Sequence, residues 1–438
     1  MSQPATTTTR PAKSARVPAI DMFRGLAVLL VVLYHISGNI LFPEGWGLAR
    51  GADGAAHIQS AGLLVRLLFL PFHMGRVGVN LFFVISGLCI HMRVARDKAT
   101  GVQRPFGAGT FFARRFFRIY PAYWTALAIG IATLPLLSAL SPSGTYVGLG
   151  VATARNIALH VFMLHSFFKD TIMTIIRPLW SIAIEEQFYI LYPLVFVWLG
   201  RRLPIGKIVL GLLAFTVAWR VTFILTQPPP QTFSDGPFLV WVFGFSLPRY
   251  FEWSLGALLA EAMATGRTVD TLPVPRFLSW ARRPPLMIAL GLGCIFAGTA
   301  SLASVRLKWL VEDPLYGTGW FLILTATLLP ATAGARAAAS ASAPTRWIAR
   351  RLENLGLRSY SVYLLHELPL IITTVLMTRW GLPRFWVAAP LAGLFIWAVC
   401  YPFYAFVEKP TEARSKRVGQ GKPVAAALAS PFAPTDAA

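Results

Sequence analysis

Charged residues, and acidic ones above all, are scarce in this sequence. Only 18 of its 438 residues are Asp or Glu, and charged residues of both signs make up 13% of the chain. That is about half the share of charged residues in a soluble globular domain. Hydrophobic residues make up 55%, and they include 31 Phe and 14 Trp. The composition excludes an ordinary soluble domain and indicates a membrane protein whose helices face lipid.

Cysteine is nearly absent as well. Cys89, Cys294 and Cys400 are the three in the chain, and they lie far apart in apolar runs. They give neither a disulfide framework nor the spacing of a metal-binding motif, so we expect no metal. The sequence also lacks the Walker A and G-x-G-x-x-G patterns, which excludes those two kinds of nucleotide site.

Positive charge is abundant, with a net charge of +22. The basic residues collect in short loops between apolar runs, as the positive-inside rule expects of a membrane protein. A nucleic-acid-binding protein would instead show a clustered basic face with stacking aromatic side chains. We therefore expect the lipid bilayer, and no nucleic acid, as a partner.

Apolar runs of about the 20 residues that a bilayer requires recur along the chain. They lie near 19–41, 76–94, 119–140, 179–200, 207–226, 246–264, 285–304, 317–334, 359–379 and 384–407. The sequence thus predicts an all-α, polytopic helical membrane bundle of about ten transmembrane helices. Two shorter apolar stretches, 58–72 and 151–168, each contain an arginine and suit interfacial or re-entrant helices better.

Three segments follow from this pattern. Residues 1–17 and 411–438 are polar or rich in Ala and Pro, and are predicted to be disordered tails on the cytoplasmic side. Residues 18–410 are predicted to form one transmembrane domain. We see no pattern of an appended soluble domain, and we expect a multi-pass protein of a bacterial inner membrane with both termini in the cytoplasm.

The first apolar run contains Arg24 and His35, and both side chains lower the stability of a helix in lipid. Eleven residues correspond to about three helical turns, so the two lie on nearly the same face, about 16 Å apart along the axis. Asp21 lies one turn before Arg24 and can pair with it. Arg24 reaching the headgroups and His35 making an interhelical hydrogen bond would explain each residue alone. Their shared face favours one site that binds an anion at its cytoplasmic mouth and transfers protons farther in.

A second basic pattern is "FFARRFFRIYPAYW", where Arg114, Arg115 and Arg118 fall within about one helical turn. The positive-inside bias explains one or two of these arginines. A phosphate-bearing cytoplasmic ligand explains the tight grouping, because guanidinium groups bind phosphate through paired hydrogen bonds. The sequence leaves both explanations open.

Two further segments carry polar groups inside apolar runs. In "GRVGVNLFFVISGLCIHM", Gly78, Ser86 and Gly87 are small residues that allow a helix or a ligand to approach closely. In "PLWSIAIEEQFYILYP", Glu185 and Glu186 enter the apolar span about two turns in. One carboxylate is expected to face a cavity and to exchange a proton or orient an imidazole, with a buried Glu–Arg pair as the structural alternative.

The segment "LRSYSVYLLHELPL" places Ser359, Tyr363 and His366 at spacings of four and three. These residues share one face of a helix. They form either a hydrogen-bonded stripe between helices or part of a site that binds a substrate or an oxyanion.

Taken in order, these segments resemble the acyltransferase 3 family of polytopic membrane acyltransferases. The resemblance covers nearly all of residues 19–410 and rests on "DMFRGLAVLLVVLYH", "GVNLFFVISGL", "RRFFRIYPAYW", "WSIAIEEQFYILYP", "SYSVYLLH" and "VEKP". It implies transfer of an acyl group, usually acetyl, from cytoplasmic acyl-CoA to a hydroxyl group of a glycan or glycosylated acceptor. Many relatives carry an extra esterase-like domain, for which this sequence shows no counterpart.

The resemblance also implies roles for particular residues. The family's arginine–histidine pair in helix 1 corresponds to Arg24 and His35, its R-x-x-R motif to Arg115 and Arg118, and its glutamate after the W-S motif to Glu185. We expect the three arginines to bind acyl-CoA, His35 to act as general base or acyl relay, and Glu185 to orient or buffer it.

Ser86, Ser359, Tyr363 and His366 are the candidates to bind the substrate or its oxyanion. A proton-coupled secondary transporter is the main alternative, because it also places charged groups on facing helices. A membrane-bound O-acyltransferase fold, which also buries a histidine, is a second alternative. The sequence leaves open the acceptor, the acyl chain length and the oligomeric state.

Overall fold

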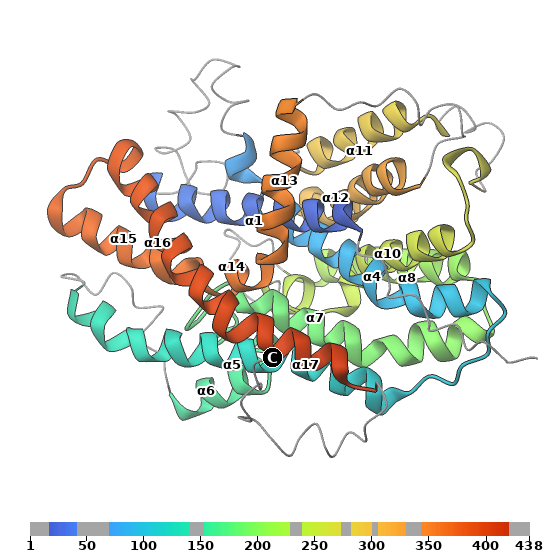
Figure 1. Cartoon of the computed structure of the whole chain (residues 1–438), viewed down its shortest axis with the longest axis horizontal. Helices are drawn as coiled ribbons and strands as arrows, with labels where there is room; N and C mark the ends of the chain where they lie inside the picture. The colour runs from blue at the N-terminus through green and yellow to red at the C-terminus, as the bar shows by residue number, and fades with distance from the viewer. Residues whose placement is uncertain are drawn as a thin grey trace, which may run out of the picture.

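A computed structural model describes residues 17–41, 70–140, 153–227, 239–272, 282–299, 305–329 and 343–419, and within these ranges it contains helices and no strand. The longer helices pack side by side, and α13 crosses α1 at a steep angle (Figure 1). In chain order the α-helices are α1 (Pro18–Ile36), α4 (Gly75–Ala99), α5 (Ala108–Leu140), α6 (Ala154–Val161), α7 (Leu179–Tyr192), α8 (Ile205–Thr226), α10 (Tyr250–Ala264), α11 (Pro284–Thr299), α12 (Val305–Leu328), α13 (Ala343–Leu357), α14 (Ser359–Leu365), α15 (Glu367–Trp380), α16 (Ala389–Phe403) and α17 (Lys409–Arg417).

The predicted all-α membrane bundle is confirmed. Six helices in the described ranges are long and apolar enough to cross a membrane, and a seventh is added if the bent pair α14–α15 counts as one span. The count of ten is not confirmed, because α10 and α11 have 15 and 16 residues and α12 carries the adjacent acids Glu312 and Asp313. The chain is a multi-pass membrane protein.

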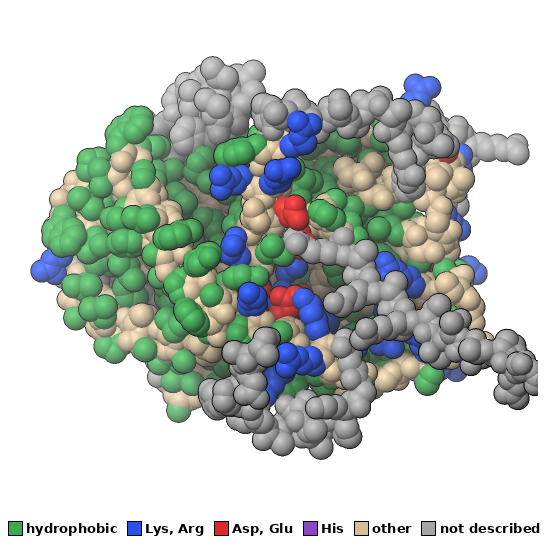
Figure 2. Space-filling model, in the orientation of Figure 1, with side chains coloured by type: hydrophobic (Ala, Val, Ile, Leu, Met, Phe, Trp, Pro, Cys, Tyr) green, Lys and Arg blue, Asp and Glu red, His purple; other side chains and the backbone are tan. Residues whose placement is uncertain are grey.

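The face of the molecule seen in Figure 2 has an apolar part and a basic part. Hydrophobic side chains cover the face over α15 and α16, whereas Lys and Arg gather over α13 and α17 (Figure 2). The exposed apolar residues of α15, α16 and the turns next to them include Trp380, Phe385, Trp386, Leu394, Trp397 and Phe406. An apolar band beside a basic rim is typical of helices that leave the bilayer on its cytoplasmic side.

Close helix packing depends on glycines in the segments that the sequence singled out. A Cβ atom on Gly87 of α4 would lie 2.0 Å from the carbonyl oxygen of Trp253, and one on Gly256 of α10 would lie 1.9 Å from that of Val84. A Cβ on Gly78 would lie 2.5 Å from a carbonyl oxygen of α1. The predicted role of small residues in helix packing is therefore confirmed.

Two irregular backbone features lie next to His35 and His366. The α1 helix continues directly into a π-helical turn, Ser37–Leu41, and such turns are frequent at functional sites. Helices α14 and α15 meet at His366 with a bend of 43°. Pro369 accounts for this break, because its ring clashes with the carbonyl group four residues earlier and it has no N–H to donate.

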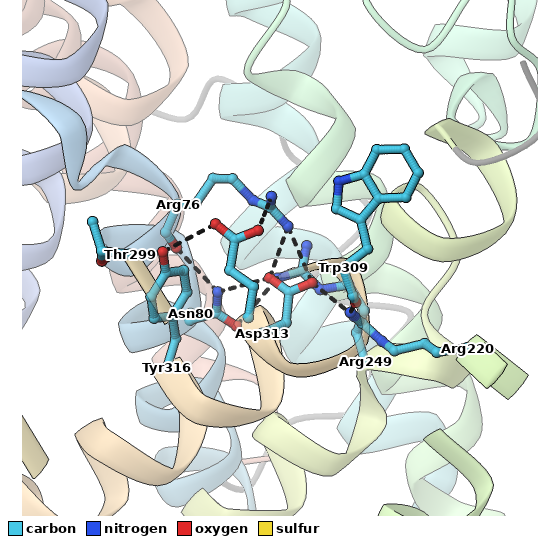
Figure 3. A network of polar contacts seen from close by, with 9 residues as sticks. Arg76, Asn80, Arg220, Arg249, Thr299, Trp309, Asp313 and Tyr316 are labelled. Carbon is cyan, nitrogen blue, oxygen red and sulfur yellow. Dashed lines mark hydrogen bonds and ion pairs between the residues drawn. The ribbon is translucent and has the colours of Figure 1, made fainter. Parts of the chain in front are cut away.

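A buried ionic cluster joins four parts of the bundle (Figure 3). Asp313 of α12 accepts hydrogen bonds from Arg220 of α8 at 2.7 Å and from Arg76 of α4 at 3.1 Å. It also accepts one at 3.2 Å from Arg249, which directly precedes α10. Arg76 makes a second ion pair, with Glu312. Asp313, Arg220 and Arg249 are each 1% exposed, so their charges compensate one another within the protein.

The predicted C-terminal tail begins later than expected. Residues 411 to 417 are helical and belong to α17, not to a disordered segment. Contacts with α5 explain this, since Ser415 donates a hydrogen bond to the carbonyl oxygen of Arg114 and Glu412 lies 3.5 Å from Arg118. Residues 1–16 and 420–438 of the predicted tails lie outside the described residues.

Of the two short apolar stretches, 58–72 and 151–168, the structure describes most of the second and little of the first. Within 151–168 the structure has α6, of eight residues, followed by a single 3-10 turn, His165–Phe167. This agrees with a segment that does not span the membrane. Most of the other stretch, residues 58–69, lies outside the described residues.

Candidate active site

A cavity of about 260 Å³ opens among α1, α4, α5, α7, α14 and α17. These elements bring together residues from nearly all the segments singled out in the sequence. The polar and charged residues that line it are Arg24, Ser86, Cys89, Arg115, Arg118, Ser181, Glu185, Tyr189, Ser359, Tyr360, Tyr363 and Glu412. Of the nine predicted site residues, seven line this cavity, and the two histidines do not.

The arginines lie together at one end of the cavity, and they differ in what compensates their charge. Arg118 pairs with Glu408 at 3.1 Å and with Glu412 at 3.5 Å, and Arg24 lies 3.7 Å from Asp21, as the sequence predicted. Within the described residues Arg115 has no ion pair, and its guanidinium lies over the Tyr189 ring at 5.7 Å. Arg115 is therefore the cation most available to an anionic ligand.

Arg114 lies on α5 beside Arg115, but its side chain turns away from the cavity. Arg114 donates a hydrogen bond from Nε to the carbonyl oxygen of Val418 at 3.0 Å, and it is not among the lining residues. The predicted group of three guanidinium groups is thus divided, because successive positions on a helix project in different directions.

Glu185 lies in the middle of the cavity wall. Its Oε1 accepts hydrogen bonds from Ser86 at 3.0 Å and from Tyr189. Ser86 also accepts one from the indole of Trp253 at 3.3 Å. The carboxylate predicted to face a cavity does so, but its partners are these hydroxyl groups, and the expected contact with His35 is not seen in the described part of the chain.

The far end of the cavity is closed by a hydrogen bond between Tyr363 and Ser181, whose oxygens lie 2.5 Å apart. The Phe82 ring packs edge-on against Tyr363 at 5.6 Å between centroids. Ser359, one turn earlier on α14, also lines the cavity, and its buried hydroxyl has no hydrogen-bond partner in the described ranges. Of the three hydroxyl groups along this wall, that of Ser359 is therefore the one available as a hydrogen-bond donor, while those of Ser181 and Tyr363 bond each other.

The two histidines meet directly beyond Tyr363. Nε2 of His366 lies 3.1 Å from Nδ1 of His35, and the ring centroids are 4.9 Å apart. The Tyr363 ring is 6.0 Å from the His366 ring. The sequence predicted His366 on the same face as Ser359 and Tyr363, but it did not predict the contact with His35. Arg24 thus lines the cavity together with Ser359 of α14, and His35 contacts His366 past the end of the cavity.

A second layer of polar groups holds the histidine region, and sequence reasoning missed it. Asn39 donates a hydrogen bond to the carbonyl oxygen of His35 at 2.8 Å and accepts one from Arg177 at 2.8 Å. Arg177 also pairs with Glu367, the residue after His366. The adjacent pair "HE" in an apolar run was the available signal, since an acid in a span needs a partner.

The arrangement combines cations at one end, a polar wall, and a pair of imidazoles beyond a tyrosine. Within the described ranges no three His, Cys, Asp or Glu side chains are grouped as metal ligands would be. A ligand with an anionic group and a long arm would place the anion at Arg115 and direct the arm toward Tyr363. The geometry supports acid–base or group-transfer chemistry at the histidines.

Comparison with known proteins gives a consistent assignment. Residues 17–405 match the acyltransferase 3 domain. The chain is 25% identical over 406 residues to the peptidoglycan O-acetyltransferase OatA of Listeria monocytogenes, a match that covers 90% of this chain and 55% of OatA. It is 26% identical over 270 residues to the acyltransferase MdmB of Streptomyces mycarofaciens, covering 58% of this chain and 60% of MdmB.

The chain therefore spans little more than half the length of these relatives. No solved structure matches it. The domain match nevertheless extends from the start of α1 into the π-helical turn that follows α16, and so includes both histidines and every cavity residue except Glu412. On this evidence the chain belongs to the acyltransferase 3 family.

Proposed function

We propose that this protein is a membrane O-acyltransferase that moves an acyl group, most simply acetyl, from acyl-CoA to a hydroxyl group of a cell-envelope glycan. One observation carries the proposal: a cavity with cations at one end leads to a hydrogen-bonded histidine pair. OatA is named for acetyl transfer to peptidoglycan, which supports acetyl as the group and a carbohydrate as the acceptor. We place the protein in a bacterial inner membrane with both termini in the cytoplasm, because the basic face lies over α13 and α17.

In this proposal the phosphates of acyl-CoA bind at the basic end of the cavity. Arg115 makes the main contact because its charge is free of a carboxylate partner in the described residues, and Arg24 adds a second cation. Arg118 contributes less, because Glu408 and Glu412 already compensate its charge. The pantetheine arm then extends along the polar wall, past Ser86 and Glu185, toward Tyr363.

The acyl group reaches the histidines only if Tyr363 leaves Ser181. Rotation of this side chain would open the far end of the cavity, and the released hydroxyl groups would donate hydrogen bonds to the oxyanion. His35 accepts the proton of the acceptor hydroxyl as that oxygen attacks the thioester carbon. The carbon–sulfur bond then breaks, and the leaving thiolate of CoA takes the proton from the imidazolium.

A two-step route through the same residues is the alternative within this function. The His35 ring would attack the thioester, release CoA and carry the acyl group to the acceptor as an acyl-histidine. Both routes use the same imidazole. They differ in whether CoA is released when no acceptor is present.

Acyl transfer by the purified protein tests the proposal. The protein in proteoliposomes is given radiolabelled acetyl-CoA with peptidoglycan fragments, and base-labile label in the glycan is measured by mass spectrometry and counting. We expect transfer by the wild type and loss of at least 100-fold in His35→Ala, the order of magnitude of a lost general base. His91→Gln, a buried histidine on α4 outside the cavity, serves as the matched control and keeps activity.

Two results would overturn the proposal. One is unchanged transfer by His35→Ala. The other is uptake of a solute by the proteoliposomes in the absence of acyl-CoA, together with no acyl transfer, which would favour a proton-coupled transporter. Release of CoA without acceptor, by the wild type and not by His35→Ala, would select the acyl-histidine route.

A further inference from the structure

The protons on the two facing imidazoles are fixed by the backbone around them. Nδ1 of His366 lies 3.0 Å from the carbonyl oxygen of Val362 and 2.9 Å from that of Tyr363. A carbonyl oxygen only accepts hydrogen bonds, so Nδ1 of His366 carries the proton. In a neutral ring this leaves Nε2 of His366 with a lone pair, and that atom faces His35.

The same reasoning applies to His35. Its Nδ1 lies 2.9 Å from the carbonyl oxygen of Val31 and 3.1 Å from Nε2 of His366. Both neighbours are acceptors, so Nδ1 of His35 is the donor. The reverse assignment would place lone pairs of the two Nδ1 atoms against three carbonyl oxygens, which is unfavourable in a buried site. Neutral His35 therefore has its lone pair on Nε2.

We propose that His366 is a positioning residue that holds His35 in the tautomer with the proton on Nδ1 and so leaves Nε2 free to act as the base. This inference rests on the proposed function, because it assigns a partner to the base of that reaction. A histidine base is commonly oriented by a group that accepts its Nδ1 proton. Here a neutral ring takes the place that a carboxylate often occupies, and Glu185 is occupied by Ser86 and Tyr189.

The surroundings of His366 suit a fixed acceptor. The residue is fully buried and lies at the 43° break between α14 and α15, where its own side chain bonds the backbone of the preceding turn. On the other side, Asn39 bonds the carbonyl group of His35 and is itself held by Arg177. Neither ring can turn over without losing bonds to carbonyl groups, so the pair is held in one arrangement.

Nitrogen NMR of the imidazoles tests the tautomer directly. Protein with 15N-labelled histidine is reconstituted in bilayers without substrate, and the His35 signals are assigned from their loss in His35→Gln. We expect wild-type His35 to show a protonated Nδ1 and an unprotonated Nε2, and His366→Leu to show the second tautomer in appreciable amount. A proton on Nε2 of wild-type His35, or an unchanged spectrum of His35 in His366→Leu, would overturn the inference.

Kinetics supply a second readout that loss of structure alone would not give. His366→Leu is expected to lower kcat about 100-fold while KM for acetyl-CoA changes less than about twofold, because the donor site is elsewhere. His366→Gln should recover at least about tenfold of that loss, since its amide oxygen can accept the Nδ1 proton. Equal activity of the Leu and Gln variants would contradict the positioning role.

The two proposals fail in different ways. A wild-type protein that transfers no acyl group would remove the proposed function, while the NMR spectrum would still decide the tautomer. Active wild type with the opposite tautomer would remove the role of His366 and leave the proposed function standing.

Discussion

Arg118 of α5 lies 3.1 Å from Glu408, a fully buried acid just before α17. The same carboxylate accepts hydrogen bonds from the backbone N–H of Ser361 at 3.0 Å and from its hydroxyl group at 2.5 Å. Glu408 therefore ties the arginine wall of the cavity to α14. Arg118, which we propose as a minor contact of the donor, thus also has a structural role in joining α5 to the segment before α17.

The first prediction separates the two arginines of the R-x-x-R motif. Arg115→Ala should raise KM for acetyl-CoA about 10–100-fold with little loss of stability, the usual cost of a charge-assisted hydrogen bond. Arg118→Ala leaves Glu408 buried without its ion-pair partner and should destabilise the protein by about 3 kcal/mol. Steady-state kinetics and thermal unfolding in detergent measure the two effects. An equal rise in KM with no change in unfolding for both variants would contradict this division.

The second prediction uses Cys89, an exposed cysteine that lines the cavity near Arg24 and Arg115. In a background with Cys294→Ser and Cys400→Ser, maleimide should label Cys89, and acetyl-CoA at ten times its Kd should slow the labelling about tenfold.

Two controls accompany the labelling experiment. The same concentration of acetyl-CoA should protect much less in Arg115→Ala, and pantetheine, which lacks the nucleotide phosphates, should protect the wild type less than acetyl-CoA does. If Cys89 is labelled equally fast with and without acetyl-CoA, the donor binds outside this cavity.

Much of this site follows from the sequence, and the part that does not has a common cause. Helical periodicity places Arg24 and His35 on one face and predicts the Asp21–Arg24 pair, because these relations lie within one helix. It does not give the rotation of one helix against another. The pattern within one helix therefore does not identify the partner of His35: the sequence predicted Glu185, whereas the structure has His366.

The buried ionic cluster is missed for the same reason. Arg76, Arg220, Arg249 and Asp313 come from four separate parts of the chain, and none lies in a local pattern that names its partners. Asp313 lies between the two expected apolar runs 285–304 and 317–334, so it belonged to no predicted span. Only packing reveals that a single carboxylate compensates several arginines.

The third prediction concerns that cluster. Asp313→Asn removes the charge shared by Arg76, Arg220 and Arg249 and should lower the free energy of unfolding by about 3–5 kcal/mol. Asp97→Asn, at a partly exposed pair 3.9 Å from Arg104, is the matched control and should change it by less than about 1 kcal/mol. Thermal unfolding in detergent compares the two variants, and equal stability would show that the cluster contributes little.

The last prediction is a pH dependence on the side of the protein that carries α6. His160 and His165 are fully buried there, and their rings stack at 4.0 Å with 10° between their planes. Burial lowers the pKa of both rings below the ordinary value of an exposed histidine. The fold therefore favours the neutral rings. The contribution of these neutral rings to the free energy of unfolding is therefore fully present above the pKa of unfolded histidine, about 6.5, and falls as the pH drops below it.

Hydrogen exchange over residues 154–168 measures this effect, and protection should decrease between pH 7 and pH 5. His165→Phe keeps an aromatic ring in the stack and cannot take up a proton, so the decrease should become smaller in that variant. The neighbouring acid Asp170 does not titrate in this window, because the hydrogen bond from Arg155 holds its pKa below its ordinary value. A decrease of the same size in His165→Phe would therefore assign the pH dependence to His160 or to a group outside the stack.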